Sequence, residues 1–299
     1  MNRPAETPLI LGGHSFISQL GNDPAATEEE QQRIVQSCLE NGIRWFDTTY
    51  QPERVALGKA LDVLGRRSEA TILAWNFFAD FSPGDPVGEA EYYRPEHIEM
   101  ILDELHTSYV DCLVVVPLDN AAETQRQEKL LAEWQRKGYV RFFGLWISDP
   151  LLGKHYRYRK PFRFAIRPFN ITTPNASSIF AAYKRLGWET IATSPFVRGW
   201  ELDRRIAEAQ SLGHGDVESL RPKLADLMLR FSLFHSNAGR VIVAMRKLDW
   251  VSANVASVSK GGLTRDELLW LERLCRASSN SLWMRVRRVL SALQRCKRF

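Results

Sequence analysis

The chain has 299 residues, of which 44% are hydrophobic and 25% charged, and its formal net charge at pH 7 is +5. These proportions are typical of a globular protein and argue against a disordered chain. No apolar run approaches the roughly 20 residues that a membrane-spanning helix needs. The first residues contain no apolar signal core, so we expect a cytoplasmic protein. The length suits one large α/β barrel or two medium domains.

Eight short runs of apolar and β-branched residues are predicted to be strands. Their side chains are apolar almost without interruption, which is typical of parallel strands that are covered on both faces. The predicted strands are residues 9–13, 44–48, 70–75, 110–116, 140–145, 162–166, 190–194 and 240–243.

Segments with the periodicity of amphipathic helices lie between these strands. The first opens with Thr27 and Glu30, which is the pattern of a capping box at a helix N-terminus. The predicted helices are residues 27–40, 96–106, 121–137, 177–186, 220–234 and 249–258. Because eight strands alternate with helices and no linker divides the chain, we predict a single (β/α)₈ TIM barrel over residues 1–262. Two more helices are expected in residues 263–299, as a C-terminal extension packed on the barrel.

One stretch resembles the signature of a known enzyme family. Residues 42–53 read GIRWFDTTYQPE, with Asp47 in a predicted strand and Tyr50 in the loop expected after it. This stretch is similar to the signature of the aldo/keto reductases, and weaker landmarks of that family are found in the usual order. They are LGG at 11–13, YVD at 109–111, GYVRFFG at 138–144, RPFN at 167–170 and SPF at 194–196. The resemblance implies a TIM barrel of the aldo/keto reductase type.

The resemblance also implies a chemistry, which this chain matches only in part. Aldo/keto reductases reduce carbonyls by hydride transfer from NADPH. A tyrosine is the acid, an aspartate and a lysine lower its pKa, and a histidine orients the substrate. Asp47 matches the aspartate, and Tyr50 matches the tyrosine at a spacing of three residues instead of five. Trp75 stands at the position of the lysine and Val116 at that of the histidine. Without a neighbouring cation the tyrosine is a much weaker acid, so we do not expect ordinary reductase chemistry.

The cofactor positions depart from the family in the same way. The positions that would hold the nicotinamide fall on Trp146, Ile147, Ile166 and Thr193. At the other end of the cofactor site the chain matches the family better. The resemblance implies that Arg246 and Lys247 contact a ribose phosphate and that the amide of Asn254 contacts the adenine. With the serine that follows Thr193, the candidate cofactor-binding residues are Arg246, Lys247, Asn254 and Ser194. We therefore predict either no cofactor or NADPH held through these residues.

At the carboxyl ends of the strands we expect an apolar substrate pocket with a few polar groups, the usual composition of a ligand site. The predicted lining is Trp75, Asn76, Val116, Trp146, Ile166 and Phe196, and the aromatic loop at 77–93 is a candidate wall. Carboxylates and histidines transfer protons without a hydride. The candidate catalytic residues are Asp47, Tyr50 and His14, with Glu53 as a further polar group. The histidines and cysteines show no metal-ligand spacing, so no metal is predicted.

Three functions remain open. The one we favour is a barrel repurposed for non-redox biosynthetic chemistry, such as a cyclisation, isomerisation or elimination, on a small and partly apolar molecule. The second is an atypical NADPH-dependent carbonyl reductase. The third is an inactive pseudoenzyme that binds or regulates a protein partner through a basic C-terminal helix. No acid follows Glu272, and basic residues are frequent at 285–298. A solvated helix face explains them more simply than nucleic-acid binding, which we do not expect.

Overall fold

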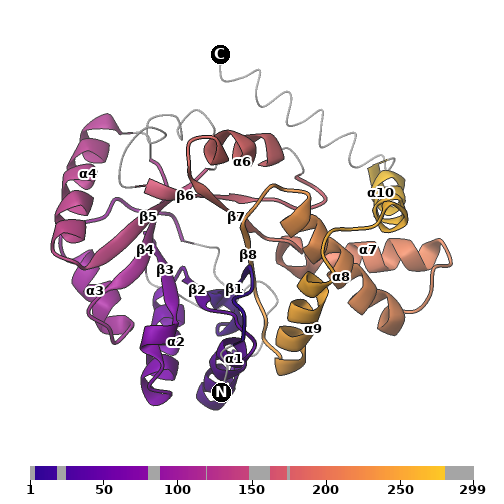
Figure 1. Ribbon diagram of the computed structural model, residues 1–299, viewed down its shortest axis with the longest axis horizontal. Coiled ribbons are helices and arrows are strands. Elements are labelled where there is room, and N and C mark those ends of the chain that lie inside the picture. The colour runs from indigo at the N-terminus through magenta and orange to yellow at the C-terminus, as the bar shows by residue number, and fades with distance from the viewer. Residues whose placement is uncertain are drawn as a thin grey trace.

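The computed structural model describes residues 4–18, 25–79, 88–118, 120–147, 162–173 and 176–279. Eight parallel strands form a closed barrel in which each strand pairs with the next in sequence and β8 pairs with β1 (Figure 1). The strands are β1 (Leu9–Gly12), β2 (Trp45–Thr48), β3 (Thr71–Trp75), β4 (Val110–Val115), β5 (Val140–Trp146), β6 (Phe162–Pro168), β7 (Glu189–Thr193) and β8 (Arg240–Val243). The predicted barrel is confirmed, and the predicted strand ends differ from the observed ones by at most two residues.

Helices cover the outside of the barrel. They are α1 (Glu28–Glu40), α2 (Gln51–Val63), α3 (His97–Glu104), α4 (Ala121–Arg136), α6 (Ala176–Lys184), α7 (Trp200–Ser211), α8 (Val217–Phe234), α9 (Leu248–Ser259) and α10 (Arg265–Ser279). In Figure 1, α1 to α4 line one side of the barrel and α7 to α10 gather on the other. The predicted capping box of α1 is confirmed, because Thr27 N–H donates to Glu30 Oε2 at 2.7 Å and Glu30 N–H donates to Thr27 Oγ1 at 3.3 Å.

Inward-facing side chains fill the barrel with a separate apolar cluster. Its buried members are Ile10, Trp45, Leu73, Trp75, Cys112, Val114, Phe164, Ile166, Ile191 and Ile242. Trp45 lies towards the amino ends of the strands, where its indole N–H donates to Glu6 at 3.0 Å and Arg240 lies 4.2 Å above its ring. Trp75 ends β3 at the opposite, carboxyl end. Each end of the barrel interior therefore carries an indole ring.

The sequence pattern predicts neither α2 nor α7. It places Tyr50 in a loop, whereas in the structure Gln51 already begins α2 and Tyr50 is the residue that precedes this helix. Pro52 lies in the first turn, where the missing N–H of proline breaks no helical hydrogen bond and its fixed φ suits the helix. Only Thr49 and Tyr50 lie between β2 and α2, so Tyr50 is held at the N-terminus of this helix.

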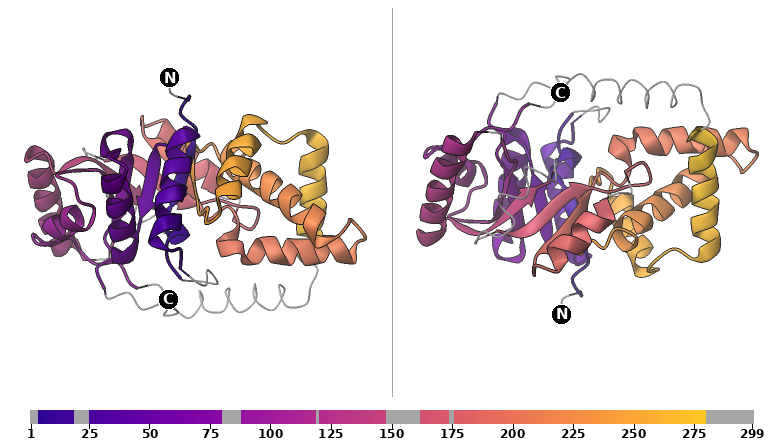
Figure 2. Two further views of the ribbon diagram at one scale, coloured as in Figure 1. Left: turned by 90° about the horizontal axis from the view of Figure 1, so that it is seen from below. Right: turned by 90° about the horizontal axis from the view of Figure 1, so that it is seen from above.

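The first part of the predicted C-terminal extension is the helix α10. Leu271 and Leu274 of this helix pack in a cluster with Leu202 and Ile206 of α7 and Leu224 of α8. Figure 2 shows α10 beside α7, away from the strands. The second predicted helix of the extension lies outside the described residues. Among the described residues, no helix is long and apolar enough to cross a membrane.

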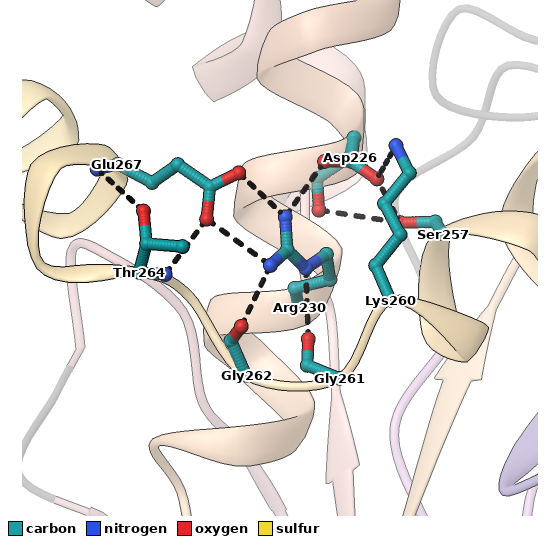
Figure 3. A network of polar contacts seen from close by, with 8 residues as sticks. All are labelled: Asp226, Arg230, Ser257, Lys260, Gly261, Gly262, Thr264 and Glu267. Carbon is teal, nitrogen blue, oxygen red and sulfur yellow. Dashed lines mark hydrogen bonds and ion pairs between the residues drawn. The ribbon is translucent and has the colours of Figure 1, made fainter.

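A buried arginine anchors the start of α10 to α8 (Figure 3). Arg230 of α8 is almost fully buried and donates to the carbonyls of Gly261 at 2.8 Å and Gly262 at 2.6 Å. Its guanidinium also pairs with both carboxylate oxygens of Glu267, at 2.9 and 3.1 Å, and with Asp226 at 3.1 Å. Bidentate contacts of this kind are among the stronger polar contacts in proteins. The hydrogen bonds from Arg230 lower the pKa of Glu267 from 4.5 to about 2.

We predict that Glu267→Gln lowers the free energy of unfolding at neutral pH and that this loss disappears in acid. Because the folded-state pKa of Glu267 is depressed, its carboxylate stabilises the fold above about pH 4.5, and this contribution is lost as the pH falls towards about 2. Urea unfolding of variant and wild type at several pH values measures the difference. Asp266→Asn changes an exposed neighbouring carboxylate and is the control. If Glu267→Gln lowers the free energy of unfolding equally in acid and at neutral pH, the ion pair between Arg230 and Glu267 does not provide this stability.

Candidate active site

The predicted site residues of β2 and β3 meet at the carboxyl end of the barrel, where the active sites of (β/α)₈ enzymes lie. Asp47 is the third residue of β2, and Trp75 is the last residue of β3. Asp47 pairs with Leu73 across the two strands. Since side chains alternate between the two faces of a strand, Trp75 faces the same side as Leu73, one step further towards the carboxyl end.

A hydrogen bond joins these two side chains. The indole N–H of Trp75 donates to Asp47 Oδ1 at 2.5 Å, and Asp47 is only 5% exposed. Burial raises the pKa of Asp47 from 3.8 to about 7, although the indole hydrogen bond opposes the rise. The negative charge of Glu53 raises this pKa further, and His14 lowers it. At neutral pH both protonation states of Asp47 are therefore populated, which suits a group that gives and takes protons.

Trp75 changes the electrostatics of the site. The family resemblance places a lysine at this position, and an ammonium beside a buried carboxylate lowers the pKa of that carboxylate. An indole N–H supplies a hydrogen bond but no charge. Because the indole is neutral, burial remains the dominant influence on the pKa of Asp47.

Tyr50 packs among aromatic rings at the start of α2. Its buried ring lies edge-to-face with Phe77 at a centroid distance of 5.6 Å, and 5.9 Å from the ring of His14. Edge-to-face contacts are favourable because the positive edge of one ring meets the negative face of the other. Phe77 also lies 6.5 Å from the ring of Trp75. The first residue of the loop at 77–93, which was predicted as a pocket wall, thus lies between Tyr50 and Trp75.

His14 and Glu53 form a polar pair between the first barrel loop and α2. His14 lies in a 3₁₀ turn after β1, η1 (Gly13–Ser15), and its Nδ1 is 3.0 Å from Glu53 Oε1. Glu53 is fully buried in the first turn of α2, where its Oε2 accepts the backbone N–H of Thr49 at 2.6 Å. The contact requires glycine at position 13, because a Cβ on Gly13 would lie 2.2 Å from Glu53 Oε2.

Four of the predicted lining residues lie together. Trp146 is edge-to-face with Trp75 at 5.3 Å, and Val116 and Ile166 belong to the same barrel cluster. Trp75 of this group is also the hydrogen-bond partner of Asp47. Phe196 lies elsewhere, because it packs against the core outside the strands and against the cluster of α7 and α8.

The side chain of Asn76 holds the backbone around the site. It is fully buried, its Oδ1 accepts the N–H of Val116 at 3.0 Å, and its Nδ2 donates to the carbonyl of Glu91 at 2.6 Å. Close by, the hydroxyl of Tyr93 donates to the carbonyl of Val114 at 2.9 Å. These bonds attach the returning end of the loop at 77–93 to the carboxyl ends of β3 and β4.

Arg54 also belongs to the site, although no sequence pattern indicated it. This residue is buried and forms an ion pair with Glu104 of α3. Its Nη1 donates to the carbonyl of Thr49 at 3.0 Å, and the carbonyl of Phe77 lies 3.5 Å away. Arg54 thereby ties together the loops that follow β2 and β3. Recognising Pro52 as a residue of a first helical turn would have placed Arg54 in a helix that packs on the barrel.

The predicted cofactor-binding residues lie after β7 and β8. Ser194 directly follows β7 in a left-handed conformation, with φ of 57°. Arg246 and Lys247 lie between β8 and α9, and Asn254 is a buried residue of α9. Lys247 is exposed and precedes the first residue of α9. A basic pair at this place suits the phosphate end of NADPH.

The residues at the nicotinamide end do not fit that group. Ile147 and Ile166 are buried, and the N–H of Ile147 donates to the carbonyl of Ile166 at 2.8 Å. Neither side chain can hydrogen-bond to a carboxamide. The ring of Trp146 lies against Trp75. As for metals, the described residues contain no group of three or more His, Cys, Asp or Glu side chains placed to hold an ion.

The chain belongs to the aldo/keto reductase family. The sequence model of this family matches residues 8–274, which include the whole barrel and most of α10. A comparison with curated protein sequences finds no match.

Solved structures share the fold at low sequence identity. The holo form of the aldo-keto reductase AKR11C1 from Bacillus halodurans is 20% identical with a TM-score of 0.70, over 89% of this chain and 91% of that one. The glycerol dehydrogenase AKR11B4 from Gluconobacter oxydans is 15% identical with a TM-score of 0.66, over 92% and 94%. An aldo/keto reductase from Klebsiella pneumoniae, in complex with NADP and acetate, is 16% identical with a TM-score of 0.66, over 90% and 91%.

We predict that Asp47→Asn gains stability relative to wild type as the pH rises. The folded-state pKa of Asp47 is about 7 against an ordinary 3.8, so the folded state binds this proton more tightly and the wild type is destabilised as the pH rises between these values. The expected relative gain is on the order of 4 kcal/mol, from a pKa difference of roughly three units at about 1.4 kcal/mol per unit. Urea unfolding at about pH 4 and about pH 8 measures it. Asp62→Asn, an exposed carboxylate at the end of α2, is the control. Equal differences at both pH values would show that Asp47 titrates normally.

Proposed function

We propose that the protein is an enzyme that moves protons on a small, partly apolar molecule at the carboxyl end of its barrel, without transferring a hydride. The hydrogen bond between Trp75 and Asp47 carries this proposal. It gives a buried carboxyl group a neutral partner, and the pKa of that group is about 7. Isomerisation, cyclisation and elimination all use such an acid or base, and in biosynthesis they need no redox cofactor.

The arrangement supports distinct roles for the site residues. The wall of Trp75 and Trp146 would hold the apolar part of the substrate, with Asp47, Tyr50 and His14 beside it. A base removes a proton from a carbon next to a carbonyl, the C–H electron pair forms a C=C bond, and the carbonyl π pair moves to oxygen. That oxygen takes a proton from the acid. If the substrate has a C=C bond next to the reacting carbon, the base gives its proton to the far carbon of that bond while the acid recovers the proton from oxygen and the C=O bond re-forms. This completes an isomerisation in which nothing is oxidised or reduced.

A second candidate is an atypical NADPH-dependent carbonyl reductase. Family membership supports it, as do two solved neighbours from Klebsiella pneumoniae that contain NADP or NADPH. Arg246, Lys247 and Asn254 would hold the phosphate and adenine end, and NADPH would supply the hydride when bound. The apolar residues at the nicotinamide end argue against this candidate.

Other features of the sequence stay predictions. They are the cytoplasmic location, the boundary between barrel and extension at residue 262, and a regulatory role through the basic helix. Residues 280–299 of that helix lie outside the described part of the chain.

We predict that the wild type exchanges the α-hydrogens of small ketones with deuterium in D₂O, as seen by loss of their proton NMR signals. Asp47→Asn removes the titrating carboxyl group and should slow the exchange by about 100-fold or more. Tyr50→Phe should also slow it while the circular dichroism spectrum is retained. Lys59→Gln on the exposed side of α2 is the control and should exchange normally. If the wild type exchanges none of a panel of apolar and polar ketones, the proposal fails.

We predict that about 1 mM NADPH raises the midpoint of thermal unfolding by less than about 1 °C. A ligand that binds only the folded state stabilises it by RT ln(1 + [L]/Kd), which is small when Kd exceeds the ligand concentration. We expect weak binding because Ile147 and Ile166 at the nicotinamide end have no polar side-chain atoms that could hydrogen-bond to the carboxamide. Differential scanning fluorimetry measures the shift, and Lys247→Ala tests its origin. A rise of several degrees that Lys247→Ala abolishes would favour the reductase, above all if a ketone then oxidises the cofactor.

A further inference from the structure

One buried carboxylate links α2 to the turn that carries His14. Glu53 is fully buried and divides its two oxygens between two partners. Its Oε2 accepts the N–H of Thr49 at 2.6 Å, and the N–H of Tyr50 lies 3.4 Å from the same oxygen. Its Oε1 lies 3.0 Å from His14 Nδ1. The carboxylate therefore touches both the start of α2 and the imidazole ring.

The helix fixes the orientation of this carboxylate. Backbone N–H groups at a helix N-terminus are donors without helical partners, and the positive end of the helix dipole stabilises negative charge there. Oε2 is held by these donors, so Oε1 is turned towards His14. The close approach of Gly13 leaves no room for the carboxylate to shift in that direction.

The orientation of Glu53 in turn decides which nitrogen of His14 carries the hydrogen. An ionised carboxylate offers only acceptor atoms, and at 3.0 Å its negative charge favours a hydrogen rather than a lone pair on the nitrogen that faces it. A neutral His14 then has its hydrogen on Nδ1 and its lone pair on Nε2. His14 keeps 28% of its side chain exposed beside Tyr50, so the ring is accessible to a ligand.

We propose that Glu53 is a positioning residue that holds His14 in the tautomer with hydrogen on Nδ1, so that Nε2 is the base of the reaction. The assignment of Nε2 as the base rests on the proposed function, whereas the tautomer is a property of the protein without ligand. Nε2 takes the proton from the substrate carbon, and the carbonyl oxygen takes the proton of Asp47. In the return step His14 gives its proton to another carbon and Asp47 recovers its own from oxygen, so both groups end as they began.

The proposal differs from a purely structural role of Glu53. Glutamate and glutamine both cap a helix, because each offers an oxygen to the backbone N–H groups. In Glu53→Gln the single amide oxygen is claimed by Thr49 N–H, so the NH₂ group must face His14 Nδ1. That nitrogen then has to accept, and the hydrogen of the ring moves to Nε2. Glu53→Gln therefore keeps the cap and reverses the tautomer.

The experiment is ¹⁵N NMR of the imidazoles in the full-length protein without ligand, at a pH where the ring of His14 is neutral, with His14→Gln used for assignment. We expect the protonated-nitrogen signal on Nδ1 in the wild type and on Nε2 in Glu53→Gln. The deuterium exchange of ketones should fall at least about 100-fold in Glu53→Gln, as expected for a base in the wrong tautomer. The midpoint of thermal unfolding should change little.

Glu30→Gln is a matched control, because Glu30 caps α1 as Glu53 caps α2 and is exposed. It should change neither the tautomer nor the exchange rate. A wild-type ring with hydrogen on Nε2 overturns the proposal without any variant, and so does an unchanged tautomer in a folded Glu53→Gln protein. Absence of ketone exchange in the wild type defeats the proposed function alone, since the tautomer is read without a substrate.

Discussion

The hydrogen bond from the Trp75 indole to Asp47 determines the character of the barrel mouth. Both residues face the interior, and their strands are in a register that sets Trp75 one step beyond the partner of Asp47. The indole therefore satisfies the carboxyl group and also offers its ring to Trp146. A buried carboxylate with a cationic partner stays charged, whereas one with a neutral partner gains or loses a proton near neutrality. The residue at position 75 thus influences both the shape and the protonation of the site.

A second constraint comes from the short connection between β2 and α2. Only two residues separate the strand from the helix, so Tyr50 lies at the helix N-terminus and cannot move as part of a loop. The next turn supplies Glu53, which reaches back to the backbone of Thr49, and Arg54, which holds the carbonyl of the same residue. The spacing of three residues between Asp47 and Tyr50 is therefore a structural feature of this chain.

The sequence predicts the barrel better than it predicts the site. Buried parallel strands are continuous apolar runs, which a sequence shows directly. Helix α7 was missed because its apolar stripe, Leu202, Ile206 and Ala209, is narrow among charged residues and is buried only against α8 and α10. Contacts such as that of His14 with Glu53 join residues far apart in sequence and depend on the space left at Gly13. The sequence shows a tryptophan where the family resemblance implies a lysine, but the direction of its indole N–H follows from packing.

The identity of the residue at position 47 bears on the choice between catalysis and mere binding. An asparagine at this position would accept the indole N–H through its amide oxygen. Because an amide does not ionise, the free energy of unfolding would not fall as the pH rises above neutrality. For a barrel that only binds a partner, the amide is the more stable solution. A carboxyl group at this place is useful when a proton must be moved, because its pKa of about 7 keeps both forms available. A buried group that lowers the free energy of unfolding, as the carboxyl group of Asp47 does, is typical of active sites. The neutral partner at position 75 is therefore in keeping with the proposed transfer of protons.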